Sequence, residues 1–214
     1  MNIPRVVYLH GFASGPSSSK ARFFAGRLKQ EGVEVRVPDL AQGDFEHLTI
    51  SGQLAVVERE AGAGPVALIG SSLGGYLAAL YAARHPEVTR AILLAPAFGF
   101  ARRWPESLGQ AELDRWRQTG YREVYHYAGG DTRRVWYRLI EDGQRYEDYP
   151  EAVQPLLVVH GTRDSVVSPE FSIEFARRRG NARLMLVDSD HQLLDVLERI
   201  WEAARTFLTA PHPS

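Results

Sequence analysis

The strongest structural signal in the chain is the run Val66-Ala67-Leu68-Ile69-Gly70-Ser71-Ser72-Leu73-Gly74-Gly75. Its apolar half predicts a buried strand over 65–70, and the Ala- and Leu-rich residues 73–84 predict a helix directly after it. Between the two, residues 70–74 match G-x-S-x-G, a sharp strand-to-helix turn that raises a serine Oγ above the sheet edge. Gly70 and Gly74 are needed because a side chain at either position would collide in so tight a turn. Ser72 is therefore the candidate nucleophile.

The same alternation of strand and helix runs through most of the chain. Short apolar runs predict strands over 5–9, 33–37, 65–70, 88–95, 155–160 and 183–188. Helical spacing of apolar residues predicts helices over 17–30, 48–60, 73–84, 169–179 and 192–208. Such alternation is typical of a mostly parallel sheet with helices on both faces. We therefore expect an α/β fold with six strands and a single domain over residues 1–214.

The alternation stops between residues 98 and 150. This segment holds three of the four Trp and six of the nine Tyr residues of the chain. Two helices are expected in it, over 105–117 and 131–141. An insert between the fourth and fifth strands emerges at the carboxyl edge of the sheet, so we predict that residues 98–150 form a small helical cap over that edge. The tail 211–214 is expected to be frayed.

A serine hydroxyl needs a base to accept its proton and a third group to orient that base. When the serine lies in this kind of turn, the acid follows it in sequence and the histidine comes last. Two histidines follow the acid region, His191 and His212, and His212 lies in the Pro-flanked tail. His191 lies in a loop between the last predicted strand and the last helix, so it is the predicted base.

Asp164 is the candidate for the orienting acid. It comes four residues after the strand end His160, which places it at the carboxyl edge of the sheet. Asp188 and Asp190 are the alternatives because they are close to His191 in sequence. Adjacent side chains on one loop rarely face each other well enough to bond, so Asp164 is the preferred assignment.

Acyl transfer also requires N–H donors for the developing oxyanion. The backbone amide of Leu73 follows the nucleophile, and that of Phe12 lies in the loop after the first strand, so both are predicted donors. Phe12 and Tyr76 flank the predicted site. With the cap residues Trp104 and Trp136, they are candidate walls for an apolar acyl group, although the cap rings would also serve as core.

Composition excludes several function classes. The net charge of −1 provides no sign of the basic face that nucleic-acid binding needs. The chain has no Cys and its histidines show no metal-ligand spacing with carboxylates, so no metal is predicted. The phosphate-binding pattern G-x-x-x-x-G-K-[ST] does not occur. The sequence shows no signal-peptide pattern and no apolar run near the ~20 residues of a membrane span, so a cytoplasmic location is expected.

Four motifs in this order resemble small α/β-hydrolase esterases: Leu9-His10-Gly11-Phe12, Gly70-Ser71-Ser72-Leu73-Gly74-Gly75-Tyr76, His160-Gly161-Thr162-Arg163-Asp164 and Ser189-Asp190-His191. The turn around the serine and the compact length are similar to the YqiA-like bacterial esterases and to a mitochondrial thioesterase branch. The resemblance implies hydrolysis of a small-molecule carboxylic ester or thioester without a cofactor. That group usually has His at the position of Ser71, and residues 98–150 match no family pattern.

Four functions remain as hypotheses from the sequence. The first is a serine esterase acting on short or medium acyl chains through an acyl-serine intermediate. The second is an acyl thioesterase, including one that deacylates proteins; it would use the same residues, so rates on matched oxygen and sulfur esters distinguish the two. The third is a small peptidase, which commonly carries an additional recognition domain. The fourth is a non-catalytic receptor with this fold, which activity measurements would separate from the others.

Overall fold

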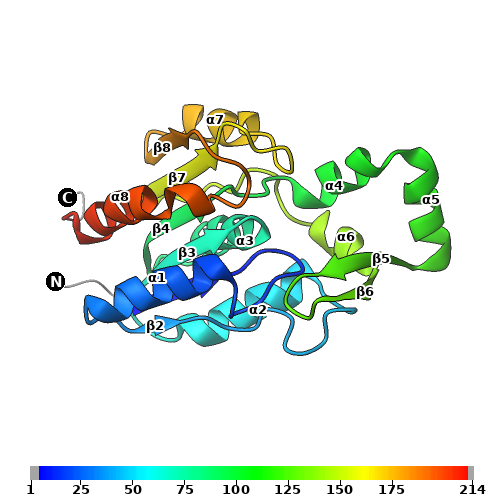
Figure 1. Ribbon diagram of the computed structural model, residues 1–214, viewed down its shortest axis with the longest axis horizontal. Coiled ribbons are helices and arrows are strands. Elements are labelled where there is room, and N and C mark those ends of the chain that lie inside the picture. The colour runs from blue at the N-terminus through cyan, green and yellow to red at the C-terminus, as the bar shows by residue number, and fades with distance from the viewer. Residues whose placement is uncertain (1–4, 212–214) are drawn as a thin grey trace.

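A sheet of six parallel strands forms the centre of the molecule (Figure 1). The computed structural model describes residues 5–211. The strands lie in the order β2-β1-β3-β4-β7-β8, and each neighbouring pair is parallel. Their bounds are β1 (Arg5–Leu9), β2 (Val35–Arg36), β3 (Val66–Ser71), β4 (Val88–Leu94), β7 (Leu156–Gly161) and β8 (Ala182–Val187).

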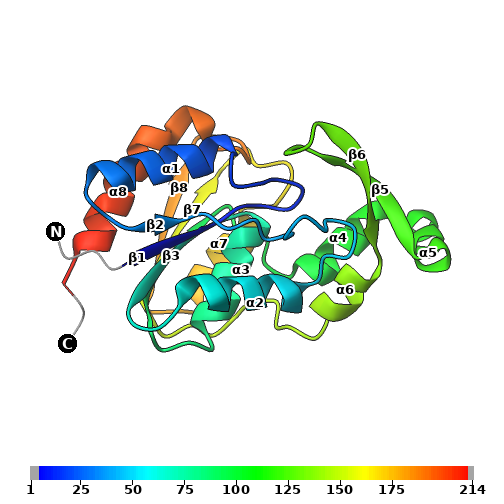
Figure 2. The ribbon, with the colours of Figure 1, turned by 90° about the horizontal axis from the view of Figure 1, so that it is seen from below.

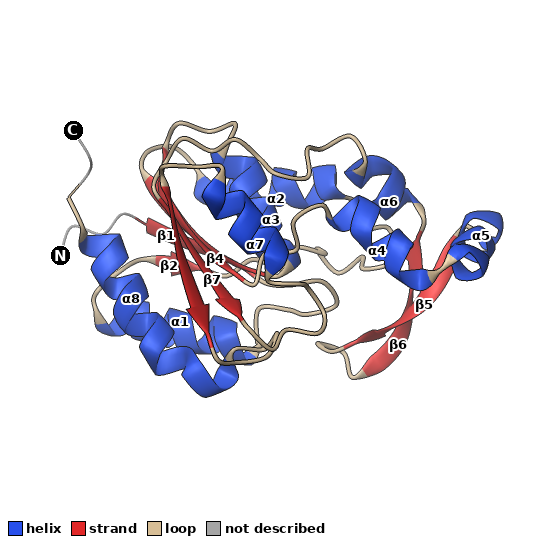
Figure 3. Cartoon of the chain, turned by 90° about the horizontal axis from the view of Figure 1, so that it is seen from above, coloured by secondary structure: helices blue, strands red, loops and turns tan. Residues whose placement is uncertain are grey.

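Helices cover both faces of the sheet, as Figure 3 shows. One face carries α1 (Ser19–Gln30) and α8 (Leu197–Thr209). The other carries α2 (Ile50–Ala61), α3 (Leu73–Ala82) and α7 (Glu170–Arg177). The chain thus has the α/β-hydrolase architecture that the sequence predicted.

The sheet has a separate hydrophobic core on each face. Successive side chains of a strand point to opposite faces. In β1, Val6 and Tyr8 therefore pack against α1 and α8, whereas Val7 and Leu9 pack towards α2 and α3. All four side chains are fully buried. A strand buried on both faces needs a continuous apolar run, which is why the sequence identified these strands.

Outside the insert, each predicted strand and helix is present, with ends that differ by a few residues. Two elements are shorter than expected. The second strand, predicted over 33–37, has ladder pairing only at Val35–Arg36. The last helix, predicted from 192, begins at Leu197 after the short 3-10 helix η1 (Leu194–Val196), because Leu193 has a φ of 57° that interrupts regular helix.

The cap is not the all-helical insert that we predicted. It contains α4 (Phe100–Leu108), α5 (Gln110–Thr119), the antiparallel hairpin β5 (Tyr121–His126) and β6 (Asp131–Trp136), and α6 (Arg138–Gly143). The predicted helix over 131–141 is therefore wrong over its first half, and the predicted helix over 105–117 is divided at Gly109, which has a φ of 77°.

Hydrophobic periodicity does not predict the hairpin because most residues on its inward face are polar. Its inward positions in β5 are Arg122, Val124 and His126, and they pair with Val135, Arg133 and Asp131 of β6. Exposed and inward positions alternate along both strands, as in any strand with one covered face. Because polar residues occupy several of the inward positions, the hydrophobic pattern does not reveal this alternation.

Figures 1 and 2 place the cap beyond the carboxyl ends of the sheet strands. Two backbone hydrogen bonds tie the hairpin to loops of the main body. The amide of Trp136 donates to the carbonyl oxygen of Glu46 (3.0 Å), and the amide of Ala128 donates to that of Ala13 (3.4 Å). The cap therefore closes one side of the space above the sheet edge.

Candidate active site

Ser72 occupies a strained turn between β3 and α3. Its φ of 55° and ψ of −119° lie in a region that residues other than Gly rarely adopt. The turn is tight: a Cβ on Gly70 would lie 2.1 Å from the carbonyl oxygen of Gly74, and a Cβ on Gly74 would lie 2.2 Å from that of Leu9. The steric reason for both glycines is therefore confirmed. The amide of Ala97 donates to the Ser72 carbonyl oxygen (3.0 Å) and helps hold the turn.

Three side chains from three strand ends meet in a hydrogen-bonded line. Ser72 Oγ lies 3.1 Å from Nε2 of His191, and Nδ1 of His191 lies 2.7 Å from Oδ2 of Asp164. The serine follows β3, the aspartate follows β7 and the histidine follows β8. With Nδ1–H donating to the carboxylate, Nε2 is free to accept the serine proton. This arrangement is what a base-activated serine requires.

Asp164 is buried and accepts hydrogen bonds at both carboxylate oxygens. Oδ1 accepts from the backbone amides of Val166 and Val167, each at 2.8 Å. Oδ2 accepts from His160 Nε2 at 3.1 Å as well as from His191. Burial opposes the negative charge, but the hydrogen bonds from His160, His191 and Val167 outweigh it and hold the pKa of Asp164 well below its usual range. The carboxylate is therefore ionised at neutral pH.

The alternative acids have other partners. Asp188 is exposed and accepts from Nε of Arg163 at 2.7 Å. Asp190 Oδ1 accepts from the amides of Gln192 (2.8 Å) and Leu193 (3.2 Å), so it shapes the loop that carries the histidine. The alternative base His212 and the tail 212–214 lie outside the described residues.

The loop after β1 passes directly beside the nucleophile. A Cβ on Gly11 would lie 3.3 Å from the Cβ of Ser72, which is closer than most side-chain contacts. The absence of a side chain at Gly11 therefore lets the loop backbone approach the serine. Among residues 5–211, the amides of Phe12 and Leu73 donate no hydrogen bond to another protein group. Both amides border the serine and are unused, which is what the predicted oxyanion donors require.

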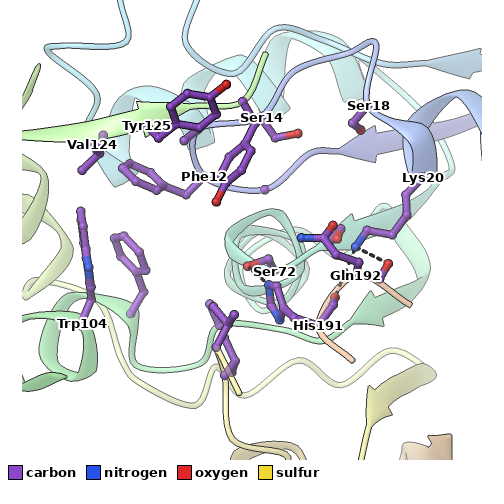
Figure 4. Close-up of a pocket in the computed structure, with 18 of the residues that line it drawn as sticks. Phe12, Ser14, Ser18, Lys20, Ser72, Trp104, Val124, Tyr125, His191 and Gln192 are labelled. Atoms are coloured by element: carbon purple, nitrogen blue, oxygen red, sulfur yellow. Dashed lines mark hydrogen bonds between the residues drawn. The ribbon is translucent and has the colours of Figure 1, made fainter. Parts of the chain in front are cut away.

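A cavity of about 1310 Å³ opens above Ser72 and His191 (Figure 4). It has two chemically different sides. The side beneath the cap carries the aromatic rings of Phe12, Phe98, Phe100, Trp104 and Phe171, and the charged cap residues Arg103, Glu106, Arg122 and Glu123 also line it. The opposite side is polar and lined by Ser14, Ser17, Ser18, Lys20 and Gln192. Figure 4 shows Trp104 and Val124 on one side of the serine, and Lys20 and Gln192 on the other.

Lys20 braces the loop that carries the histidine, a role that no pattern in the sequence indicates. Its Nζ donates to the carbonyl oxygens of Gln192 (2.8 Å) and His191 (3.4 Å). Burial lowers the pKa of Lys20 to about 8, against the raising effect of Asp190 and Asp164. The preceding Ser18 caps α1 by accepting from the amide of Ala21 at 3.4 Å.

Two of the four predicted wall residues line the cavity and two do not. Phe12 and Trp104 line it, with ring centroids 5.0 Å apart. The prediction that Tyr76 is a wall residue is wrong. Tyr76 is 1% exposed, lies in the core and donates from its hydroxyl to the carbonyl oxygen of Glu147 (2.8 Å). The same prediction for Trp136 is also wrong, since Trp136 lies on the outward side of β6, is 37% exposed and stacks on His47 with ring centroids 5.8 Å apart.

The described residues contain no group of three or more His, Asp or Glu side chains placed to hold a metal ion. Over the same residues, none of the helices combines the length and the apolar character needed to cross a bilayer.

A family model described as an uncharacterised protein family, UPF0227, matches residues 5–208. A search of curated proteins finds no significant match.

Solved structures of similar fold cover nearly the whole chain. Est1E from Butyrivibrio proteoclasticus with bound ferulic acid is 22% identical with a TM-score of 0.81, covering 96% of this chain and 88% of its own. Alpha/beta hydrolase domain-containing protein 10 from mouse is 20% identical with a TM-score of 0.80, covering 96% and 89%. A monoacylglycerol lipase from Paleococcus ferrophilus is 18% identical with a TM-score of 0.73, covering 95% and 93%. At these identities the likeness establishes the fold.

Proposed function

The chain belongs to the UPF0227 family, and we propose that it is a serine hydrolase that cleaves carboxylic esters of short or medium acyl chains. The observation that carries the proposal is the line Ser72–His191–Asp164, with contacts of 3.1 and 2.7 Å. The solved structures of the same fold include an esterase from Pyrococcus furiosus and the monoacylglycerol lipase, which supports an ester substrate.

The proposed reaction has two halves. In the first, Oγ of Ser72 attacks the carbonyl carbon while Nε2 of His191 accepts the hydroxyl proton. The Phe12 and Leu73 amides hold the resulting oxyanion. The bond to the leaving oxygen then breaks, His191 returns the proton to that oxygen, and the alcohol departs from an acyl-Ser72 ester.

In the second half, water replaces the alcohol. His191 removes a proton from the water as it attacks the acyl carbon, and the tetrahedral intermediate releases the carboxylic acid and the Ser72 hydroxyl. Asp164 remains ionised throughout; it holds His191 in the Nδ1–H tautomer and stabilises the imidazolium that forms in each half. The buried carboxylate with its four N–H donors is well suited to that task.

The test is mass spectrometry of the intact protein after exposure to a fluorophosphonate probe, followed by peptide mapping. We expect a single adduct on Ser72 that is absent from the His191→Ala variant, because the reaction requires an activated serine. A protein that forms no adduct would contradict the proposal and favour the non-catalytic receptor. Once the adduct is found, rates on matched oxygen esters, thioesters and peptide amides decide between the esterase, the thioesterase and the small peptidase.

A further inference from the structure

The guanidinium of Arg122 lies in the wall of the cavity without a hydrogen-bond partner. Arg122 is on β5, and the cavity lining includes it. Its Nε and Nη1 atoms are buried, and neither meets an acceptor among residues 5–211. Its Cζ lies 5.4 Å from the ring centroids of both Trp104 and Trp116. The two indole rings hold the cation in place but leave its N–H donors unused.

Arg103, another arginine that lines the cavity, has hydrogen-bond acceptors within the protein, in contrast to Arg122. Nε of Arg103 donates to the carbonyl oxygen of Phe98, and Nη2 donates to the hydroxyl of Tyr149, both at 3.0 Å. A buried charged donor without an acceptor is unfavourable. Arg122 therefore has an unmet requirement for an acceptor, and an anionic one answers it best.

Nearby protein carboxylates do not meet this requirement within residues 5–211. Glu112 raises the pKa of Arg122 against the larger lowering effect of burial, but its carboxylate pairs with Arg115 at 2.9 Å. Glu106 and Glu123 border the cavity and are exposed, and neither forms an ion pair with Arg122. Nε and Nη1 have almost no accessible surface, so a molecule in the cavity reaches the guanidinium through Nη2, which also has no protein acceptor among residues 5–211.

A continuous aromatic wall connects the nucleophile to this guanidinium. Gly11 lies against Ser72, and the ring of the next residue, Phe12, is 5.0 Å from that of Trp104. Trp104 in turn lies under the guanidinium of Arg122. A chain that follows these rings away from Ser72 arrives at Arg122.

The acyl group, rather than the alcohol, occupies this side. In the proposed mechanism His191 protonates the leaving oxygen, so the alcohol leaves on the side of the histidine. That side is the polar one, where Gln192 and Lys20 lie (Figure 4). The acyl chain is left with the aromatic side.

We infer that Arg122 binds a carboxylate at the far end of the acyl group, so that the preferred substrates are monoesters of dicarboxylic acids. This inference rests on the proposed function and specifies the substrate class of the same site. Phe12 and Trp104 contact the methylene chain, and Nη2 of the guanidinium donates to the carboxylate in a charge-assisted hydrogen bond.

The test compares two p-nitrophenyl ester series that differ only at the far end of the acyl chain. One series consists of the monoesters of adipic, suberic and sebacic acids. In the other, an isopropyl group of the same shape replaces the free carboxylate. At one chain length we expect the wild type to have a kcat/KM at least about tenfold higher for the carboxylate ester. In Arg122→Met the ratio should reverse, because the carboxylate would then lie unpaired among aromatic rings. Arg134→Met, an exposed arginine on the neighbouring strand that does not line the cavity, should keep the wild-type ratio.

The outcomes separate this inference from the proposed function. A wild type that prefers the isopropyl-ended ester at every chain length overturns the inference, whether or not Arg122→Met folds. An unchanged ratio in a folded Arg122→Met protein also overturns it. If the wild type hydrolyses neither series, the proposed function fails. The inference is then judged by calorimetry on Ser72→Ala, where tighter binding of the carboxylate ester than of its isopropyl partner supports it and the reverse order rejects it.

Discussion

The carboxyl edge of the sheet and the cap over 98–150 face each other across one cavity, but they are held in different ways. At the edge, Ser72 and Asp164 follow β3 and β7, whose residues are all buried, and His191 follows the partly buried outer strand β8. The cap hairpin has exposed residues along both strands, and it contacts the body through two backbone hydrogen bonds of 3.0 and 3.4 Å, the buried Val135 and ring contacts with Phe45 and His47. Under the proposed function, we expect the edge to carry out the chemistry and the cap to select the acyl group.

The largest effect is expected at the edge, from Ser72→Ala. Removing Oγ leaves no atom to form the acyl intermediate, so kcat should fall by about 10⁴-fold or more. The substitution removes one oxygen atom that lines the cavity and does not pack in the core, so Tm should stay close to that of the wild type. Measured turnover of p-nitrophenyl butyrate close to the wild-type rate, with Tm unchanged, would mean that a different residue is the nucleophile.

Asp164→Asn should be the next largest. The amide disfavours the His191 tautomer that leaves Nε2 free for Ser72, and the expected loss of kcat is about 10⁴-fold. Asp190→Asn is the matched control, since it makes the same change next to His191 at a side chain that bonds only loop amides. We expect that control to stay within about tenfold of the wild type. A larger loss in Asp190→Asn than in Asp164→Asn would reverse the assignment of the acid.

The same substitution should change how stability depends on pH. The hydrogen bonds that lower the pKa of Asp164 in the folded protein are absent in the unfolded chain, where the pKa is about 4. The stabilisation is therefore fully present above that pH and is lost as the pH falls below it. The free energy of unfolding, measured with urea between pH 3 and 6, should fall less steeply in Asp164→Asn than in the wild type. Parallel curves would mean that the carboxylate contributes nothing to acid stability.

Gly74→Ala addresses the rigidity of the edge itself. The new Cβ would lie 2.2 Å from the Leu9 carbonyl oxygen and 2.5 Å from that of His10, and these backbone atoms have little room to adjust. We expect a loss of about 3 kcal/mol in the free energy of unfolding, at the upper end for an overpacked site. Gly26→Ala is the control, because it lies on α1 with nothing within 4 Å and should gain up to about 1 kcal/mol. Equal stabilities for the two variants would show that the turn tolerates a side chain.

The two regions also differ in how far the sequence predicts them. Strands buried on both faces must be apolar, so β1, β3, β4 and β7 were identified within a residue or two. Parallel strands bring their carboxyl ends to one edge, and so the residues after β3, β7 and β8 were expected to meet. Their proximity follows from the parallel topology, whereas the contacts of 3.1 and 2.7 Å depend on the conformations of the loops that carry Asp164 and His191.

The cap offers no such regularity. Arg122 and His126 take inward positions of β5 that a hydrophobic pattern assigns to apolar residues. The wrong predictions for Tyr76 and Trp136 also have local structural reasons. All ten residues of α3 are buried, so helical spacing does not reveal that Tyr76 points away from the cavity. Trp136 is placed on the outer surface by the register of β6 against β5, which depends on pairing and not on composition.

The smallest and most specific effect is expected from a pair of tryptophans in the cap. Trp104 lines the cavity next to Phe12, whereas Trp136 stacks on His47 outside it. Trp104→Ala should therefore lower kcat/KM for medium-chain relative to short-chain acyl esters by about tenfold, because each buried methylene contributes about 0.8 kcal/mol. Trp136→Ala should leave this ratio within about twofold. If the two variants change the chain-length profile equally, the cap acts only as a structural cover, and the selection of substrate must lie at the sheet edge after all.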